Sequence, residues 1–464
     1  MRVVPIAYTD PAAAFAAFAD EPVAALLQSC APDGPRGRYS YIAAEPYRLI
    51  VATRRGVMVD GEPVPGDPFS VLERELAAVP PPDGPCPVPF RTGAVGFLGY
   101  ELGRHLERLP PPHMVGPGQP EMVMGLYDTV IAFDHQEEAA YVISSGAPET
   151  VPIARARRAA MRAHGFLHRL SGASETPAAP DWGPHSAWQP DLGRAEVEER
   201  IARTIAYICA GDIFQANITQ RFTAPMPVGL NDRGLYARLR ALSPAPFAAL
   251  LTCGRAMAVA SASPERFLSL DADRWVETRP IKGTRPRHPD PWQDAAFAAD
   301  LSQSAKDRAE NLMIVDLMRN DLGRVAELGS VTVPVLNGLE TFASVHHLVS
   351  VVRARLREGL GPVDLLRATF PGGSITGAPK IRAMEIIHEL EPAPRGVYCG
   401  AIAWIGFDGA MDSSIVIRTL VRVGDTVMAQ AGGGIVADSD PAAEYEESMV
   451  KIAPLLRAVA GPRP

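Results

Sequence analysis

The sequence predicts an α+β fold in which many short strands and several helices share a large core. Strand patterns dominate the first 147 residues, helical patterns follow near the middle of the chain, and the two mix from there to the end. The composition is that of a globular protein, because 47% of the 464 residues are hydrophobic and 21% are charged. A chain of this length can form two or three domains or one large composite unit.

The N-terminal region, residues 1–170, is expected to consist mainly of strands followed by one helix. Short runs of β-branched and aromatic residues are bounded by loops rich in Pro and Gly, which is the pattern of strands in a sheet. The helix is expected over Val151–Leu170, where Ala and Arg dominate. The expected strands include Tyr39–Ala43, Arg48–Ala52, Gly93–Phe97 and Thr129–Phe133.

A candidate linker separates this region from the rest of the chain. Residues 171–192 are polar and rich in Pro, Gly and Ser. An amphipathic helix is expected directly after it, over Gly193–Ala210, and opens a second region that covers residues 193–464. Neither region contains an internal repeat or a low-complexity tail.

Charge, hydropathy and cysteine spacing argue against several classes of protein. The formal net charge of −8 is unlike that of a general nucleic-acid binder. The N-terminus, Met1–Pro5, has no apolar signal core, and no run of 18 apolar residues predicts a membrane span. The five cysteines are scattered without a CxxC spacing, so neither a zinc site nor a disulfide framework is expected. A cytoplasmic location fits these features.

Lys282 is the strongest candidate for a chemically active residue. It lies in the basic segment Thr278–Arg287, which is expected to form a turn after a strand at Arg274–Glu277. Three arginines of the same segment flank it, and like charges lower the pKa of a lysine. A lysine that is neutral near pH 7 is an amine nucleophile. The alternative interpretation is a solvated lysine in a basic loop.

Acidic residues at helical spacing suggest a cation site. In an expected C-terminal helix, capped by Asp440, the side chains of Glu444, Glu447 and Lys451 stack on one face. Two carboxylates one turn apart can share a hard divalent cation, and the lysine could bind a substrate carboxylate. The alternative is a surface Glu447–Lys451 pair, which would contribute about 0.3–0.5 kcal/mol.

A second expected helix, around Ser304–Asn320, carries another such pair, Asp307 and Glu310. Four carboxylates from the two helices would repel one another unless Mg²⁺ or a similar ion joined them. The sequence alone does not place one helix beside the other. The helix is expected to pack on the core through Leu312, Val315, Leu317 and Met318.

Two glycine-containing segments are suited to binding an anion. Three glycines at 432–434 lie in an expected strand–turn–helix and would let a ligand approach backbone N–H groups, although a simple tight turn is an equal alternative. In the loop Phe370–Lys380, Ser374 and Thr376 could cap the following helix, whose N-terminus attracts anions.

Tyr398 and Arg418 are expected on two apolar strands, Val397–Ile405 and Ser414–Val421. An inward-facing arginine on such a strand is costly unless it meets an anion. Arg418 is therefore a candidate for binding a substrate carboxylate.

These segments, in this order, resemble the chorismate-utilising enzymes, a family that includes anthranilate synthase component I, aminodeoxychorismate synthase component I, and isochorismate and salicylate synthases. The resemblance is strongest over roughly residues 210–455. It implies an α+β fold with two large antiparallel sheets packed as a sandwich and surrounded by helices, to which the N-terminal half also contributes strands. The matching segments are Gly211–Phe222, Ser263–Phe267, Pro280–Thr284, Glu310–Arg324, Phe370–Lys380 and Asp440–Lys451.

Lys282 indicates the branch of this family. Anthranilate synthases usually carry alanine at the matching position, whereas aminodeoxychorismate synthases carry lysine, and Asn217 also looks more like the latter. The resemblance thus implies conversion of chorismate and ammonia to 4-amino-4-deoxychorismate, a precursor of p-aminobenzoate and folate. The alternatives are anthranilate synthesis for tryptophan, an isochorismate- or salicylate-forming activity, and a non-catalytic tryptophan-binding regulatory subunit.

The resemblance also implies roles for individual residues. Lys282 would add to C2 of chorismate, and Glu265 would protonate the departing C4 hydroxyl, which requires a raised pKa. His347 resembles a family histidine linked to pyruvate elimination, and an ordinary core histidine is the alternative. The implied Mg²⁺ ligands are Glu310 and Glu447 with help from Asp307 and Glu444, and the implied chorismate contacts are Gly283, Thr284, Tyr398, Arg418, Gly432, Gly433, Gly434 and Lys451.

Partners and a second ligand are implied as well. None of the five cysteines stands in the Gly-x-Cys-x-Gly setting of a glutaminase, so a separate glutamine amidotransferase subunit is expected to supply ammonia and form a heterodimer with this chain. Leu26–Ser29 and Gly37–Tyr41 look like segments of the tryptophan pocket of anthranilate synthase, with Gln28 in place of the usual glutamate. The candidate tryptophan contacts are Ser29, Pro246 and Phe247.

Overall fold

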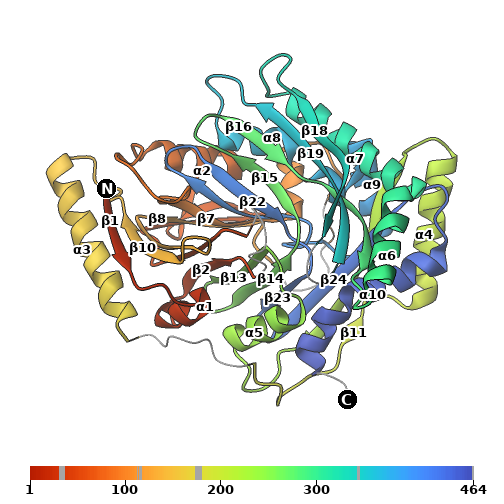
Figure 1. Cartoon of the computed structure of the whole chain (residues 1–464), viewed down its shortest axis with the longest axis horizontal. Helices are drawn as coiled ribbons and strands as arrows, with labels where there is room; N and C mark the ends of the chain where they lie inside the picture. The colour runs from red at the N-terminus through yellow and green to blue at the C-terminus, as the bar shows by residue number, and fades with distance from the viewer. Residues whose placement is uncertain (31–36, 112, 114–117, 173–179, 342–344, 462–464) are drawn as a thin grey trace.

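A computed structural model of the chain contains two twelve-stranded sheets with helices around them (Figure 1). The structure describes residues 1–30, 37–111, 113, 118–172, 180–341 and 345–461. Every strand pair within these ranges is antiparallel. The predicted α+β class and the two-sheet antiparallel architecture are therefore confirmed. None of the helices in the described ranges is both long and apolar enough to cross a membrane.

The first sheet, here called sheet A, runs from the N-terminal strand to the candidate anion-binding glycines. Its strand order is β1 (Arg2–Ile6), β10 (Ala139–Ser144), β9 (Thr129–Asp134), β3 (Tyr39–Ala44), β2 (Val23–Gln28), β13 (Phe247–Cys253), β14 (Met257–Ser263), β23 (Thr419–Val423), β24 (Thr426–Ile435), β12 (Gln215–Pro225) and β11 (Gln189–Pro190), with β20 (Gly377–Ala378) also paired to β12.

The second sheet, sheet B, has the strand that carries Lys282 at one edge. Its order is β17 (Ile281–Pro286), β19 (Val345–Arg355), β16 (Trp275–Thr278), β15 (Arg266–Leu270), β22 (Met411–Ile415), β21 (Ala401–Gly406), β7 (Gly93–Leu98), β8 (Met122–Tyr127), β4 (Arg48–Thr53), β5 (Gly56–Val59) and β6 (Glu62–Val64), with β18 (Thr332–Thr341) also paired to β19.

Helices cover the outer faces of the sheets, with α3 at one end of the molecule and α4 at the other (Figure 1). The α-helices are α1 (Pro11–Ala14), α2 (Pro68–Ala77), α3 (Pro152–Leu170), α4 (Arg194–Cys209), α5 (Asp232–Leu242), α6 (Pro291–Gln303), α7 (Ala305–Gly323), α8 (Pro362–Thr369), α9 (Lys380–Leu390) and α10 (Pro441–Ala460). Three short 3₁₀ segments are η1 (Phe15–Phe18), η2 (Tyr100–His105) and η3 (Gly373–Ile375).

Both sheets contain strands from either side of the candidate linker. In sheet A, Leu26 of β2 pairs with Leu250 of β13. In sheet B, Gly96 of β7 pairs with Ala403 of β21. Residues 1–170 and 193–464 are thus regions of sequence whose strands interleave in space. The end of the candidate linker, Gln189–Pro190, itself adds a short strand to sheet A.

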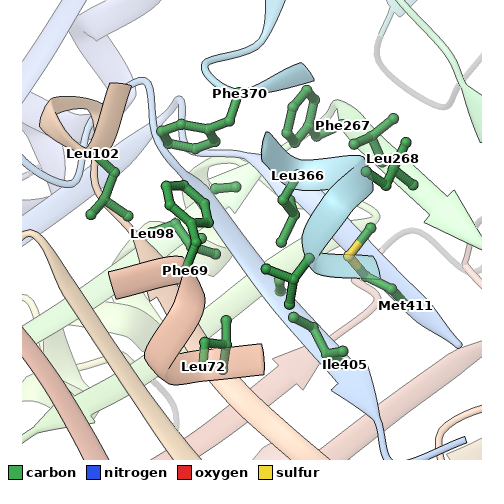
Figure 2. Close-up of a cluster of buried hydrophobic side chains, with 14 of the residues drawn as sticks. Phe69, Leu72, Leu98, Leu102, Phe267, Leu268, Leu366, Phe370, Ile405 and Met411 are labelled. Carbon is green, nitrogen blue, oxygen red and sulfur yellow. The ribbon is translucent and has the colours of Figure 1, made fainter. Parts of the chain in front are cut away.

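Separate apolar clusters hold the layers together. One lies between the sheets and joins side chains such as Tyr41 and Val259 of sheet A to Phe97 and Ile402 of sheet B. Another packs α2, α7 and α8 on the outer face of sheet B. Figure 2 shows side chains of that second cluster, Phe370 among them. The centroids of the Phe370 and Phe267 rings lie 6.4 Å apart. This contact anchors the start of the loop 370–380 close to the segment that carries Glu265.

Most elements expected from the sequence are present. The four expected strands correspond to β3, β4, β7 and β9, and the two helices to α3 and α4. The expected apolar face of α7 is only partly correct, because Val315 and Met318 are buried whereas the side chain of Leu312 is 52% exposed.

Candidate active site

Residues from widely separated parts of the chain surround Lys282. Its Nζ lies 3.9 Å from a carboxylate oxygen of Glu310 on α7. Glu265, Glu447 and Lys451 are also close enough to influence the pKa of its ammonium electrostatically. The structure thus brings together the candidate nucleophile, the candidate acid and two of the candidate metal ligands.

Lys282 lies within β17, and the prediction of a turn there was wrong. Its backbone pairs with Leu348 of β19, and the register shifts before the next pair, Thr284 with His347. Gly283 occupies this irregularity with a φ of +74°, a conformation that glycine adopts without strain. A Cβ at Gly283 would lie 2.8 Å from the carboxyl carbon of Asp307, so the glycine also allows α7 to approach the strand.

Burial lowers the pKa of the Lys282 amine, and the nearby ammonium of Lys451 acts in the same direction. The carboxylate of Glu310 opposes this shift. The flanking arginines were expected to cause the depression, and that expectation was wrong because acidic partners neutralise them. These pairs join Arg279 to Glu277 and Glu340, Arg285 to Asp300 and Asp307, and Arg287 to Asp294.

Glu265 lies in the connection between β14 and β15, with 6% of its surface exposed. Burial raises the pKa of its carboxyl to about 7, although a hydrogen bond with the Ser374 side chain and the charge of Lys282 both oppose the rise. A carboxyl with such a pKa carries its proton in part of the molecules at neutral pH. This is the property that a general acid requires.

The four candidate metal ligands come from α7 and α10, which lie on the same side of the molecule (Figure 1). Asp440 caps α10 by accepting a hydrogen bond from the Ala443 amide at 2.8 Å, as predicted. Glu444 is 7% exposed and accepts a hydrogen bond from the Ser439 hydroxyl at 2.7 Å. The Glu310 carboxyl has a raised pKa because it is partly buried.

These carboxylates turn toward lysines in the structure. Glu444 lies 3.4 Å from the Nζ of Lys306, and Glu447 lies 2.6 Å from that of Lys451. Burial favours a raised pKa for Glu447, but the ammonium groups of Lys451, Lys306 and Lys282 together lower the pKa below its ordinary value. Within the described ranges, no three His, Cys, Asp or Glu side chains are already grouped to hold a metal ion. The donor set still fits Mg²⁺ in chemistry, because it offers only carboxylate oxygens.

The three consecutive glycines continue strand β24 and do not form a turn, which corrects the predicted strand–turn–helix. Gly432, Gly433 and Gly434 pair with successive residues of β12. A Cβ at Gly432 would lie 2.0 Å from the Ile218 carbonyl oxygen. A Cβ at Gly433 would instead point between Glu444 and Lys451, at 3.1 and 3.6 Å. The middle glycine therefore keeps space open at the candidate site.

Tyr398 and Arg418 lie beside strands and not within them, so their predicted positions were wrong by a few residues. Arg418 falls between β22 and β23 with a φ of +54°, and its Nη1 donates to the Lys451 carbonyl at 2.8 Å. Burial lowers the pKa of its guanidinium, while Tyr398 and Glu447 oppose the shift. Burial also raises the pKa of the Tyr398 hydroxyl. The Tyr398 hydroxyl is nevertheless close enough to influence the Arg418 guanidinium electrostatically.

The loop 370–380 contacts Glu265, the candidate general acid, through Ser374. None of its side chains caps helix α9. That helix begins after Pro379, with no side-chain hydrogen bond at its N-terminus. The Thr376 hydroxyl donates to the Gly372 carbonyl, and the Ser374 carbonyl accepts from the Asn217 side chain at 2.6 Å. The sequence reasoning missed the contact between Ser374 and Glu265, because the two are far apart in sequence.

Lys380 ties both ends of this loop to α7. Its Nζ donates to Asp321 at 2.5 Å and to the Thr369 carbonyl at 2.7 Å, and both side chains are largely buried. No sequence signal beyond the position of Lys380 at the end of the loop indicated this pair.

His347 lies next to the site on β19. Its Nδ1 is 3.0 Å from the hydroxyl oxygen of Thr284, a candidate chorismate contact. This position is compatible with the candidate catalytic role, which stays a prediction.

A separate cavity of about 600 Å³ opens between the two sheets, away from Lys282. Pro246 and Phe247 line it, whereas Ser29 does not. Gln28 also borders the cavity, but its side-chain oxygen accepts a hydrogen bond from Tyr236 at 2.9 Å. Two of the three candidate tryptophan contacts therefore face one cavity.

The chain matches the family described as chorismate binding enzyme over residues 27–457. It is 42% identical over 449 residues to aminodeoxychorismate synthase component 1 of Escherichia coli (strain K12), a match that covers 96% of this chain and 94% of the relative. It is also 42% identical over 457 residues to anthranilate synthase component 1 of Streptomyces coelicolor, covering 94% and 86% respectively.

The fold has a close counterpart among solved structures. Anthranilate synthase component I from Streptococcus pneumoniae superimposes with a TM-score of 0.81 at 32% identity, over 92% of this chain and 93% of that one. Sequence and fold therefore agree along nearly the whole length, and the chain belongs to the family of chorismate binding enzymes.

Proposed function

We propose that this chain converts chorismate and ammonia to 4-amino-4-deoxychorismate, as the first component of an aminodeoxychorismate synthase. Relatives of similar identity carry the names of this enzyme and of anthranilate synthase, so overall similarity does not choose between the products. Lys282 favours aminodeoxychorismate as the product over anthranilate, because it places a buried amine beside Glu310 and near Glu265.

Lys282 has the properties of a nucleophile in this setting. Burial favours its neutral form, and only the neutral amine has a lone pair for attack. The proposed first step forms a bond between Nζ and C2 of chorismate while the C4–O bond breaks. Ammonia then forms the C4–N bond as the C2–N bond to Lys282 breaks. The net change exchanges the C4 hydroxyl for an amino group and releases water.

Glu265 is the proposed general acid for the departing hydroxyl. Its pKa of about 7 keeps a proton available, and the Ser374 side chain fixes the position of the carboxyl. Since hydroxide is a poor leaving group, proton donation at C4 is needed for the first step.

The carboxylates of chorismate have basic partners available. Arg418, Tyr398 and Lys451 lie together and would receive the enolpyruvyl carboxylate, for which a guanidinium is well suited. Gly433 leaves room for that group beside the strand. The ring carboxylate would lie near Gly283 and Thr284, on the Lys282 side of the site.

Mg²⁺ is the proposed cofactor, held by Glu310 and Glu447 with Glu444 and Asp307 close by. When bound, the ion would neutralise the ring carboxylate and polarise the attached π system. The carboxylates would hold the ion, and Lys282 and Glu265 would carry out the bond-making and proton-transfer chemistry.

A partner subunit and a second small-molecule ligand also belong to this proposal. A separate glutamine amidotransferase subunit would supply the ammonia, in keeping with the name "component 1" of the relatives. Tryptophan would occupy the cavity that Pro246 and Phe247 line, where Trp404 and Tyr41 add aromatic surface.

The function is tested by comparing the products of the wild-type chain and of Lys282→Ala. Each protein is supplied with chorismate, Mg²⁺ and ammonium, and the products are separated by mass. The wild type is expected to make 4-amino-4-deoxychorismate with its pyruvyl group retained, and the variant to lose this activity. Anthranilate and pyruvate from the wild type would overturn the proposal in favour of anthranilate synthesis.

A further inference from the structure

Lys306 is a charged residue at the candidate metal site to which the proposed reaction gives no role. It lies in the first turn of α7, next to Asp307, and its Nζ is 3.4 Å from the Glu444 carboxylate of α10. The lysine side chain is 51% exposed, whereas that of Glu444 is 7% exposed. The carboxylate is therefore fixed in the protein, and the ammonium reaches it from the solvent side.

The Lys306–Glu444 contact lies among other charged side chains. Besides Glu444, the Glu310 and Glu447 carboxylates lie close enough to act on the Lys306 ammonium. Without a cation between them they would repel one another. The other two lysines at the cluster, Lys282 and Lys451, have proposed functions in attack and substrate binding. Lys306 contributes positive charge to the same place.

A divalent ion and the Lys306 ammonium would compete for the carboxylate of Glu444. Both are cations that seek the same oxygens, and at such short separations like charges repel strongly. The long, half-exposed side chain can swing into water when a metal ion arrives, whereas the buried Glu444 cannot follow it.

We propose that Lys306 is an internal counter-cation of the metal site, which holds Glu444 in the metal-free enzyme and must be displaced when a divalent ion binds. The inference rests on the metal site of the proposed function. It predicts that Lys306 weakens the binding of the ion to the resting enzyme, because each binding event must break the Lys306–Glu444 pair.

The direct test is the affinity of the full-length chain for Mn²⁺, measured without chorismate by the electron paramagnetic resonance signal of the free ion. Lys306→Met should bind Mn²⁺ about two- to fivefold more tightly than the wild type, the range expected for a partly exposed ion pair. Lys306→Arg keeps the charge and should stay near the wild type. Circular dichroism and thermal melting verify that each variant is folded.

Arg308→Met is the matched control, because it removes one positive charge from an exposed side chain of the same helix, two residues away. It should change the affinity much less than Lys306→Met. In a Glu444→Gln background the Lys306→Met substitution should not increase the affinity for Mn²⁺, since the Lys306–Glu444 pair is already broken. Equal effects of Lys306→Met and Arg308→Met, or weaker Mn²⁺ binding by Lys306→Met, would overturn the inference.

The same measurement separates this inference from the proposed function. A wild-type chain that binds no Mn²⁺ even with chorismate present would contradict the metal site, and the role of Lys306 with it. Tight Mn²⁺ binding that Lys306→Met leaves unchanged would contradict the role of Lys306 alone.

Discussion

The amine of Lys282 lies 3.9 Å from the Glu310 carboxylate, although one residue belongs to an edge strand and the other to helix α7. The pairing has two consequences. It gives the buried lysine a counter-charge in the resting protein, and it joins the proposed nucleophile directly to the proposed metal ligands.

The pH dependence of turnover should follow Glu265 on the alkaline side. With a pKa of about 7, its carboxyl loses the proton that the leaving hydroxyl needs as the pH rises through that value. Turnover should therefore fall above about pH 7, while deprotonation of Lys282 acts in the opposite direction. Initial rates from pH 5.5 to 9.5 measure this. A Glu265→Gln variant with the same rate and profile as the wild type would exclude Glu265 as the acid.

Glu265 should also make stability depend on pH. Its pKa is raised from 4.5 to about 7 in the folded chain, so the folded state binds a proton more tightly than the unfolded state does. Its contribution to stability is therefore lost as the pH rises from about 4.5 to 7. Glu265→Gln lacks this loss, so its free energy of unfolding should rise above that of the wild type as the pH increases. The difference should reach about 3 kcal/mol at pH 8.

Urea denaturation of both proteins at pH 5 and pH 8 checks this difference. A difference in unfolding free energy that is the same at both pH values would show that the carboxyl is not perturbed by burial.

Two neighbouring glycines should respond differently to substitution by alanine. Gly433→Ala would place a methyl group 3.1 Å from Glu444, within the candidate site, and should raise the KM for chorismate with little loss of stability. Gly432→Ala would bring a methyl group 2.0 Å from the Ile218 carbonyl and should destabilise the fold by about 1–3 kcal/mol. Thermal melting and steady-state kinetics distinguish the two. Unchanged kinetics of a folded Gly433→Ala would place the substrate elsewhere.

The Lys380–Asp321 pair should be important for stability. Lys380→Met leaves the buried Asp321 without its partner and should cost about 3–5 kcal/mol of unfolding free energy. The double variant Lys380→Met with Asp321→Leu should cost clearly less, because no uncompensated charge remains. Equal losses for the single and double variants, measured by urea denaturation, would mean that packing and not charge pairing explains the effect.

Glu447→Gln should weaken Mg²⁺ binding and nearly abolish turnover, since it removes a negatively charged oxygen ligand. The test is a titration of Mg²⁺ in the amination assay, with Glu446→Gln as control, because Glu446 is an exposed neighbour on the same helix that pairs with Arg194. Wild-type turnover and Mg²⁺ dependence of Glu447→Gln would contradict the proposed metal site.

Much of the architecture could be predicted because it depends on local patterns. Asp440 followed by proline predicted where α10 begins. The spacing of Glu444 and Glu447 predicted that their side chains lie on one face of that helix. The resemblance to a known family supplied the two-sheet fold that periodicity alone could not provide.

The errors arose where long-range pairing overrides local propensity. The glycines at 432–434 look like a turn, yet β12 continues to pair with them and they stay in a strand. Lys282 looks like part of a basic turn, yet β19 pairs with it. Its pKa is set by burial beneath elements distant in sequence, and the adjacent arginines are neutralised by acids that no local pattern identifies. Lys306 was missed for the same reason, because its partner Glu444 is 138 residues away.

The proposed covalent bond between Lys282 and the substrate would change the mass of the protein. The chain is incubated with chorismate and Mg²⁺ without ammonia, quenched, and digested for mass spectrometry. The peptide carrying Lys282 is expected to gain the mass of chorismate less one water. Ammonium is then expected to remove this adduct as 4-amino-4-deoxychorismate appears. An unmodified Lys282 peptide, together with full amination activity in Lys282→Ala, would contradict covalent catalysis by Lys282.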